Sequence, residues 1–285
     1  MKIAVIGLGL IGGSLCKSIK KHTFHSVCGI DTDPETIKQA LEQDAIDEAI
    51  DADGLGEADL SIICLYPRAI CDFVRNNADK FKPGSIVIDT CGVKKAVVDC
   101  CSPLLEERGV IFVGAHPMAG REFSGFEYST DTLFDNASFI ITPTEKTPSI
   151  ATNLLSTLAG SIGFGNVVIA SPEKHDQIIA YTSQLAHVVS NAYVKSPSVS
   201  DFNGFSAGSF MDLTRVAKLN EDMWTDLFMC NKQALLTEID QILKNITEYR
   251  SALAENDSDR LRSLLRDGRI LKEKCNEMYG KKNKK

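Results

Sequence analysis

Short apolar runs rich in β-branched residues recur through the first 170 residues and alternate with stretches of helical period. The apolar runs predict strands at Lys2–Ile6, Val27–Ile30, Leu60–Leu65, Ser85–Asp89, Val110–Gly114, Ser138–Thr142 and Val167–Ala170. The stretches between them predict helices near Leu10–Lys20, Pro34–Glu42, Arg68–Lys80 and Lys94–Glu107. This alternation is typical of βαβ units in an α/β fold with a doubly wound, mostly parallel sheet.

The pattern changes at Ser171 and Pro172, after which no further strand is predicted. Ser171 is a suitable N-cap, and Pro172 a suitable first residue, for an amphipathic helix that runs to about Val194. Two further long helices are predicted at about Asn220–Leu253 and Asp257–Tyr279. Helices of this length cannot bury their apolar faces within so small a domain, so we expect them to pair with a second copy of the chain.

A glycine-rich turn, Gly7-Leu8-Gly9-Leu10-Ile11-Gly12, directly follows the first predicted strand and opens a helix. In a G-x-G-x-x-G turn, Gly7 permits the tight turn, Gly9 lets the backbone approach a pyrophosphate, and Gly12 allows close packing of helix on strand. The first N–H groups of the helix, around Leu10 and Ile11, are then available to the anion. The motif predicts a dinucleotide site of the Rossmann type.

Asp31 ends the second predicted strand, at the distance from the glycines where an acidic residue can bind a ribose 2′-hydroxyl. A carboxylate there repels a 2′-phosphate, and no Arg immediately follows it, so the sequence favours NAD over NADP. We therefore predict an NAD-binding Rossmann domain over residues 1–170 and an all-helical substrate-binding and dimerisation domain over residues 171–285.

Composition narrows the class of protein further. The chain of 285 residues has a net charge of −7, which argues against nucleic acid as a partner. No stretch reaches the ~18 uninterrupted apolar residues of a membrane span, and we expect no membrane association. The nine cysteines are odd in number and include no C-x-x-C pair. This pattern predicts reduced thiols in the cytoplasm, without disulfides or a metal site.

His116 follows the predicted strand at Val110–Gly114 and begins the segment HPMAGRE. Ligands of doubly wound sheets bind beyond the carboxyl ends of the strands, so we expect His116 to project into the cofactor crevice. An imidazole has a pKa near neutrality and suits proton transfer at this place. A packing role at the end of a strand is equally compatible with the position alone.

Two features of the helical part are candidates for binding. Ser183 and His187 are spaced i, i+4 and share a face of the first long helix, although a buried histidine with a backbone or Ser partner explains the pattern equally. His175, near the start of this helix, is expected on the surface. Arg215 lies in the apolar segment SFMDLTRVA and requires a carboxylate partner, which is either Asp212 or a substrate.

These motifs together resemble the prephenate dehydrogenase family, which includes arogenate dehydrogenases. The matching segments are GLGLIGGS, the strand end at Asp31, DTCGVKK, GAHPMAGRE with the following SGF, SQLAH, and DLTRVA with Trp224. The resemblance implies a Rossmann domain followed by a helical dimerising domain. It also implies oxidative decarboxylation of prephenate to 4-hydroxyphenylpyruvate, with NAD as hydride acceptor, on the route to tyrosine.

The resemblance also implies roles for single residues. His116 would be the hydrogen-bond partner and base for the ring hydroxyl. His187 would help to bind substrate from the helical domain, beside Ser183 and Gln184, and Arg215 would bind a substrate carboxylate. Asp31 and the glycine turn would bind NAD.

Two segments depart from the family pattern. Many members read G-S-V-K where this chain has Cys91-Gly92-Val93-Lys94, so the Ser is absent. Cys91, next to its place, could stand in as a weak donor, but packing is its expected role. The helix motif S-H-L-P-H is here Ser183-Gln184-Leu185-Ala186-His187. Gln184 can donate a hydrogen bond but cannot become charged. These departures leave the contacts with substrate, and the choice between prephenate and arogenate, open.

Three other functions are compatible with the sequence. An arogenate dehydrogenase would have the same fold and chemistry. A 3-hydroxyacid dehydrogenase would be expected to use a catalytic Lys in the first long helix, where only Lys174 is present, at its start. A non-catalytic NAD-binding regulator would bind NAD without turnover and would not require His116.

Overall fold

The computed structural model describes residues 1–121, 123–201, 204–205 and 208–282. The chain divides into two compact units, Met1–Leu235 and Leu236–Lys285, which are considered separately below. The first contains the sheet, its covering helices and the glycine turn; the second is helical.

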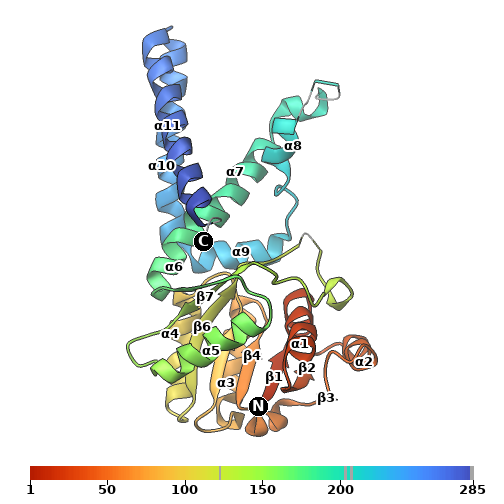
Figure 1. The fold of residues 1–285 in the computed structure, drawn as a ribbon. Helices are drawn as coiled ribbons and strands as arrows, with labels where there is room; N and C mark the ends of the chain where they lie inside the picture. Colours follow the sequence, from red (N-terminus) through yellow and green to blue (C-terminus); the bar gives the residue numbers. More distant parts are fainter. Residues whose placement is uncertain (122, 202–203, 206–207, 283–285) are drawn as a thin grey trace. The chain divides into compact units, whose positions relative to one another are not determined.

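One sheet organises the first unit (Figure 1). Its strands are β1 (Lys2–Ile6), β2 (Ser26–Ile30), β3 (Glu48–Ala49), β4 (Leu60–Ile63), β5 (Ile86–Asp89), β6 (Ile111–Pro117), β7 (Ser138–Thr142) and β8 (Asn166–Ile169). Their order across the sheet is β3-β2-β1-β4-β5-β6-β7-β8, and only the β6–β7 pair is antiparallel. The segment from β3 to β6 has the 3-2-1-4-5-6 order of the Rossmann fold, which confirms the predicted class.

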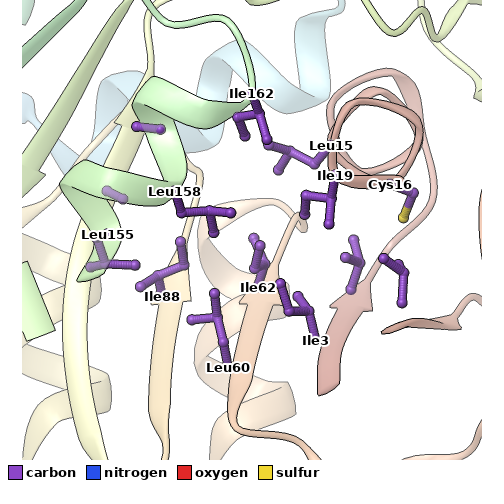
Figure 2. Close-up of a cluster of buried hydrophobic side chains, with 14 of the residues drawn as sticks. Ile3, Leu15, Cys16, Ile19, Leu60, Ile62, Ile88, Leu155, Leu158 and Ile162 are labelled. Carbon is purple, nitrogen blue, oxygen red and sulfur yellow. The ribbon is translucent and has the colours of Figure 1, made fainter. Parts of the chain in front are cut away.

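Helices cover both faces of this sheet (Figure 1). They are α1 (Leu10–His22), α2 (Pro34–Glu42), α3 (Pro67–Asn77), α4 (Lys95–Glu106) and α5 (Ser149–Ser161), with 3-10 turns at Ala52–Glu57, Ala78–Lys80 and Phe126–Tyr128. Successive strand residues point to opposite faces, so the apolar strands contribute to two cores. Ile3 and Ile62 pack beneath α1 and α5, whereas Ala4 and Ile63 belong to the core beneath α3 and α4. Figure 2 shows the first of these cores, in which Leu155 and Leu158 of α5 approach the strands.

The sequence pattern misses two elements of this unit. β3 has only two residues, both exposed, so no apolar run marks it. The helix α5 is interspersed with Ser and Thr, yet its buried residues Ala151, Leu155, Leu158 and Ala159 follow the i, i+4, i+7, i+8 spacing of a helix. That spacing is the signal that could have identified α5.

The helices after β8 depart from the predicted continuous ones. They are α6 (Pro172–Ile179), a π-helical turn at Ala180–Gln184, α7 (Leu185–Tyr193), a 3-10 turn at Pro197–Asp201, α8 (Gly208–Thr214), α9 (Glu221–Cys230) and α10 (Lys232–Ala254). The single helix predicted over Asn220–Leu253 is wrong, because it ends and restarts at Asn231. The Asn231 amide donates to the Gln184 side chain and to the Asp176 carbonyl, both at 2.8 Å.

The second unit comprises most of α10 together with α11 (Ser258–Lys282). The two helices lie side by side as a hairpin (Figure 1), and the Tyr249 hydroxyl donates to the Leu264 carbonyl at 3.3 Å. Asn256 adopts a left-handed conformation in the short connection, with φ of 52°. Within the described residues, no helix is long and apolar enough to cross a membrane.

Candidate active site

The glycine turn between β1 and α1 has the backbone geometry that its sequence predicts. Gly7 has a φ of 87°, and its N–H donates to the Ile30 carbonyl at 2.8 Å. A Cβ on Gly12 would lie 1.9 Å from the Gly7 carbonyl oxygen, so only glycine allows the helix to start this close to the strand. In contrast, nothing lies within 4 Å of a Cβ position on Gly9, which leaves its backbone open to a ligand.

The start of α1 is suited to an anion. Gly9 is the N-cap and supplies no side-chain hydrogen bond, and the first turn contains no acidic residue. The N–H groups of Leu10 and Ile11 therefore have no intrahelical acceptor, and the helix dipole adds partial positive charge. Backbone N–H groups at the carboxyl end of β1 are the features that a pyrophosphate requires, so these residues fit a dinucleotide.

Asp31 lies directly after β2 and contacts the glycine turn. Its carboxylate accepts from the Leu8 N–H at 2.7 Å and from the Asp33 N–H at 2.9 Å. These bonds fix the carboxylate beside the turn while leaving further lone pairs for a sugar hydroxyl. Thr32 and Asp33 follow Asp31 in the sequence, so neither of the next two residues is a cation that could receive a 2′-phosphate.

His116 lies within β6, next to its carboxyl end, and belongs to a chain of hydrogen bonds. Its Nδ1 is 2.9 Å from Nε2 of His175, and Nδ1 of His175 is 2.7 Å from the Asp176 carboxylate. Asp176 also accepts from the backbone N–H groups of Lys94 and Lys95, at 2.8 and 2.9 Å. The two rings meet edge to face, with centroids 5.1 Å apart. The sequence predicts a surface position for His175, and this is wrong: its side chain is fully buried between α6 and the end of β6.

These bonds determine which nitrogens hold protons. A carboxylate only accepts, so Nδ1 of His175 is the donor to Asp176, and in a neutral His175 ring Nε2 is the acceptor. His116 then donates from Nδ1, which leaves Nε2 of His116 with a free lone pair. Withdrawal from water lowers the pKa of His116 well below its usual value, and the nearby His175 ring and Lys94 ammonium act in the same direction. The structure thus holds a neutral imidazole with an unprotonated nitrogen at the end of β6.

A buried ion pair supports the ends of β5 and β6, which position this series of hydrogen bonds. The Lys94 ammonium contacts the Asp89 carboxylate and donates to the Ala115 carbonyl at 2.6 Å, and both charged side chains are completely buried. Ala115 immediately precedes His116 in β6. Removal of either charge would leave its partner unpaired in the protein interior, which typically costs about 3–5 kcal/mol.

His187 lies in a different environment, on α7. Its Nδ1 donates to the Val216 carbonyl at 3.1 Å, and its ring contacts the Trp224 indole with centroids 3.8 Å apart. It lines a cavity of about 280 Å³ together with Trp224 and Phe228 of α9, Asn191, Lys195 and Glu221. Partial burial lowers the pKa of His187, and the positive charge of Arg215 contributes in the same direction.

Two protein-family models match the chain, one over each half of the predicted domain organisation. Residues 15–168 match the model described as the prephenate dehydrogenase nucleotide-binding domain, and residues 171–267 match the model described as its dimerization domain. The chain belongs to the prephenate dehydrogenase family. This is a family of NAD-dependent oxidoreductases, as the sequence resemblance implies.

Individual relatives of the prephenate dehydrogenase family agree with this assignment. The chain is 32% identical to the prephenate dehydrogenase of Bacillus subtilis over 91% of its own length and 72% of that protein. A solved prephenate dehydrogenase from A. aeolicus, in complex with hydroxyphenyl propionate and NAD+, superposes with a TM-score of 0.86 at 28% identity over 96% of this chain and 98% of that one. The Synechocystis arogenate dehydrogenase structure gives 0.83 at 27% identity, over 96% and 99%.

The family serine that is missing from this chain would stand next to the imidazole. A Cβ on Gly92 would lie 4.0 Å from Nε2 and Cε1 of His116 and 3.4 Å from the Leu227 side chain. Cys91 is buried, and its sulfur forms hydrogen bonds with the backbone carbonyl and N–H of Val93. The expected packing role of Cys91 therefore agrees with the structure, and Gly92 places no side chain between Nε2 of His116 and Leu227.

The other predicted residues of the helical part are placed as follows. Gln184 is buried, and its amide is engaged by Asn231 and by the Leu227 carbonyl at 3.3 Å. Ser183 lies in the π-helical turn and is half-buried, so the shared face with His187 that a regular α-helix implies does not apply directly. Arg215 follows α8 and is exposed. No contact between His187 and His116 is present in the described part of the chain. Trp224 of α9 contacts His187, and Leu227 of the same helix lies beside Gly92, which adjoins His116.

Sequence reasoning missed His175 and Asp176. Their signal was present, because Ser171 and Pro172 start α6 as predicted and so place both residues in its opening turns. What the sequence could not supply was the neighbour, since the end of β6 is distant along the chain and meets α6 only in the fold.

Proposed function

We propose that this protein is a prephenate dehydrogenase that converts prephenate to 4-hydroxyphenylpyruvate with NAD. The observation that supports this most directly is the neutral His116, held by His175 and Asp176 with a free Nε2, at the carboxyl end of a strand in the sheet that also bears the glycine turn. Family membership supports the same reaction.

Gly7, Gly9 and Gly12 would hold the pyrophosphate of NAD, with the first N–H groups of α1, and Asp31 would bind the adenosine ribose. NAD, when bound, supplies the acceptor for the hydride that leaves the ring carbon of the substrate. The chain's own contribution is to place this acceptor beside the strand ends and to exclude a 2′-phosphate through the Asp31 carboxylate.

His116 would accept the proton of the ring hydroxyl at Nε2 as the carbon that bears it loses its hydride. The proton that His116 gains is balanced electrostatically through His175 by the Asp176 carboxylate, which is anchored to two backbone N–H groups. Carbon dioxide then leaves the substrate, the electrons of the broken C–C bond complete the aromatic ring, and the resulting phenolate takes up a proton to give 4-hydroxyphenylpyruvate. Because aromatisation makes the step strongly favourable, the main tasks of the protein are orientation and charge complementarity.

We propose that the second substrate-binding region is formed by His187 and Arg215, with Ser183 and Gln184 as supporting residues. His187 has a free Nε2 once Nδ1 donates to Val216, and Arg215 is close enough to lower its pKa. A guanidinium whose charge reaches His187 suits a substrate carboxylate, and the aromatic cavity that His187 lines suits the substrate ring. Gln184 would act indirectly, since its amide is already bonded to Asn231 and Leu227.

The test follows the reduction of NAD to NADH and of NADP to NADPH by purified protein, with prephenate and with arogenate as substrates. We expect turnover of prephenate with NAD, slower turnover with NADP, and loss of turnover in His116→Asn. Absence of turnover on both substrates would exclude the proposal, and faster turnover with NADP would contradict the role of Asp31. Tight NAD binding without turnover would identify a regulator instead.

Arogenate dehydrogenase is the second candidate, because the solved Synechocystis relative bears that name. Arogenate has an amino group where prephenate has a side-chain ketone, so it adds a positive charge that a cationic Arg215 would not favour. The ratio of kcat/KM for the two substrates decides between the candidates.

We further propose that the chain forms a homodimer through its C-terminal helices, in keeping with the dimerization-domain match, and works in the cytoplasm, where its nine free cysteines remain reduced. Leu236, Leu243, Ile246 and Leu253 are exposed on α10 and follow a heptad spacing. Leu243→Glu combined with Ile246→Glu should convert dimer to monomer in sedimentation velocity, whereas Lys244→Ala should not. An unchanged dimer in the double variant would place the interface elsewhere.

A further inference from the structure

Three cysteines lie close together where α3 packs against α4, on the face of the sheet that these two helices cover. Cys71 comes from α3 and Cys100 and Cys101 from α4, and their three sulfur atoms lie within 4.8 Å of one another. Cys71 and Cys100 are half-buried, whereas Cys101 is fully buried. The cluster belongs neither to the glycine turn nor to either histidine environment.

A guanidinium lies against these sulfurs. Arg75, one turn after Cys71 in α3, points Nη2 at the Cys100 sulfur at 3.4 Å while Nη1 binds the Asp72 carboxylate at 2.9 Å. A cation in contact with a thiol stabilises its thiolate, which is the reactive form. Two sulfurs at close range with a cation beside them are the features of a pair that can form a disulfide.

The electrostatics differ among the three thiols. Hydrogen bonding by Cys101, then by Cys100, together with the charge of Arg75, lowers the pKa of Cys71 to about 6. Burial raises the pKa of Cys100 to about 11, with Cys71 as a further cause. Of these two thiols, Cys71 is therefore the one that ionises more readily.

The Cys71 thiol opens into a cavity of about 260 Å³. Its lining includes Arg68 and Arg75, together with Asp72, Ala96, Val97 and Cys230. The guanidiniums of Arg68 and Arg75 at the wall of the cavity favour an anionic ligand, although each also has a carboxylate partner within the protein. A small, acidic disulfide would thus meet both positive charge and a thiolate.

We propose that Cys71 and Cys100 form a thiol–disulfide exchange site for small anionic disulfides such as oxidised glutathione, with Cys71 as the attacking and Cys100 as the resolving thiol. Cys100 is chosen over Cys101 because it is less buried and contacts Arg75, which can stabilise its thiolate once Cys71 has reacted. The site is independent of the proposed dehydrogenase activity.

The exchange proceeds in two balanced steps. The Cys71 thiolate attacks one sulfur of the small disulfide, whose S–S bond breaks, and one small thiolate leaves as the mixed disulfide forms. Cys100 then loses its proton to solvent and attacks the Cys71 sulfur, which expels the second small thiolate. Two protein thiols are oxidised by two electrons, and the small disulfide is reduced to two thiols.

The first experiment needs no variant and measures alkylation of each cysteine in the reduced protein at pH 6, with a chelator present. At pH 6, a pKa of about 6 gives Cys71 about a 150-fold larger thiolate fraction than an ordinary thiol. A less basic thiolate is also a weaker nucleophile, which reduces this advantage in rate by about 13-fold. We therefore expect Cys71 to react about 10-fold faster than the thiol of an unstructured cysteine-containing peptide in the same solution, which serves as the reference. Equal rates would overturn the proposal.

The second experiment treats the protein with oxidised glutathione and maps its disulfides by peptide mass spectrometry. We expect a Cys71–Cys100 bond in wild type, a stable glutathionyl group on Cys71 in Cys100→Ser, and no oxidation of Cys100 in Cys71→Ser. Cys230→Ser, which changes a thiol of the same cavity outside the cluster, should still give the Cys71–Cys100 bond. A bond from Cys71 to Cys101 or Cys230, or oxidation of Cys100 without Cys71, would overturn the assignment.

Discussion

The two histidines that the sequence places in the site have contrasting surroundings. His116 lies in a strand and is linked through His175 and Asp176 to two backbone N–H groups, so its protonation and orientation are fixed. His187 lies on a helix after a π-helical turn, makes one bond to a backbone carbonyl, and borders a cavity with Trp224. Proton transfer requires a defined lone pair, whereas binding requires access, and the two environments match these separate needs.

The largest expected effect comes from removing the base while keeping the chain of hydrogen bonds. His116→Asn retains a donor toward His175 but has no nitrogen that can accept a proton. We expect kcat with prephenate and NAD to fall by about 10²- to 10⁴-fold, with little change in NAD affinity. Steady-state kinetics and a fluorescence titration of NAD measure the two quantities. A fall of less than tenfold would mean that another group takes the proton.

The next largest effect concerns the residue that orients the base. Asp176→Asn keeps the shape of the side chain but replaces a carboxylate, which only accepts hydrogen bonds, with an amide that also donates them. The tautomers of His175 and His116, which depend on the acceptor at Asp176, are then no longer fixed. We expect kcat to fall about 10- to 100-fold, with a changed pH profile of kcat/KM. A merely structural role would lower the melting temperature and leave the pH profile unchanged.

How much of this chain the sequence can predict depends on the range of the interactions. The glycine turn and Asp31 are local signals, because strand, turn and helix follow one another within a few residues, and the structure has them as predicted. His116 is set by a strand end, which an apolar run reveals. His175 is buried by contact with a strand far away in the sequence, and no local pattern indicates this.

The helical part was harder for the same reason. Asn231 lies inside a continuous helical period, and the helix breaks there because buried amide bonds to Gln184 and to the Asp176 backbone override local propensity. Gln184 was expected to face substrate because of its place in a motif. Its burial could not be read from spacing, since the π-helical turn alters which residues share a face.

A smaller effect should separate binding from proton transfer. His187→Asn removes the imidazole from the cavity and leaves the His116 chain untouched. We expect KM for prephenate to rise about 10-fold, the value of one hydrogen bond to a charged group, while kcat stays within about threefold. Trp224→Phe provides a control for the loss of ring contact alone. If kcat fell as far as in His116→Asn, the division of roles between the two histidines would be wrong.

The pH dependence of stability tests the contrast without substrate. Burial lowers the pKa values of His116, His175 and His187 in the folded protein, so below the ordinary value of about 6.5 the unfolded chain binds more protons than the folded one. The free energy of unfolding should therefore decrease as pH falls from about 6.5, by up to about 1.4 kcal/mol per pH unit for each such proton.

Urea unfolding at several pH values measures this slope, which should be shallower in His116→Asn because one of the buried titrating rings is gone. His22→Asn, a change at an exposed histidine, is the matched control. Equal slopes in wild type and His116→Asn would show that the folded protein does protonate this ring, against its assignment as a neutral base.

The smallest effect is expected for Gly92→Ala, and comparison with a larger side chain at this position tests whether substrate approaches Nε2 of His116 past Gly92. A Cβ there would make only ordinary contacts, at 3.4 Å to Leu227 and 4.0 Å to the His116 ring, so Gly92→Ala should change the free energy of unfolding by less than about 0.5 kcal/mol and kcat/KM by less than about threefold. Gly92→Val adds methyl groups toward Nε2 and should lower kcat/KM by at least about 10-fold while NAD affinity is unchanged.

The difference between these two variants, measured side by side, tests whether substrate occupies the space that the absent family serine would otherwise share. Gly92→Ser adds an instructive third point, because its hydroxyl would come within reach of Nε2 and could donate to the lone pair that His116 needs. If Val were tolerated as well as Ala, the substrate hydroxyl would have to approach His116 from another side, and the proton acceptor would no longer be the nitrogen that the hydrogen bonds leave free.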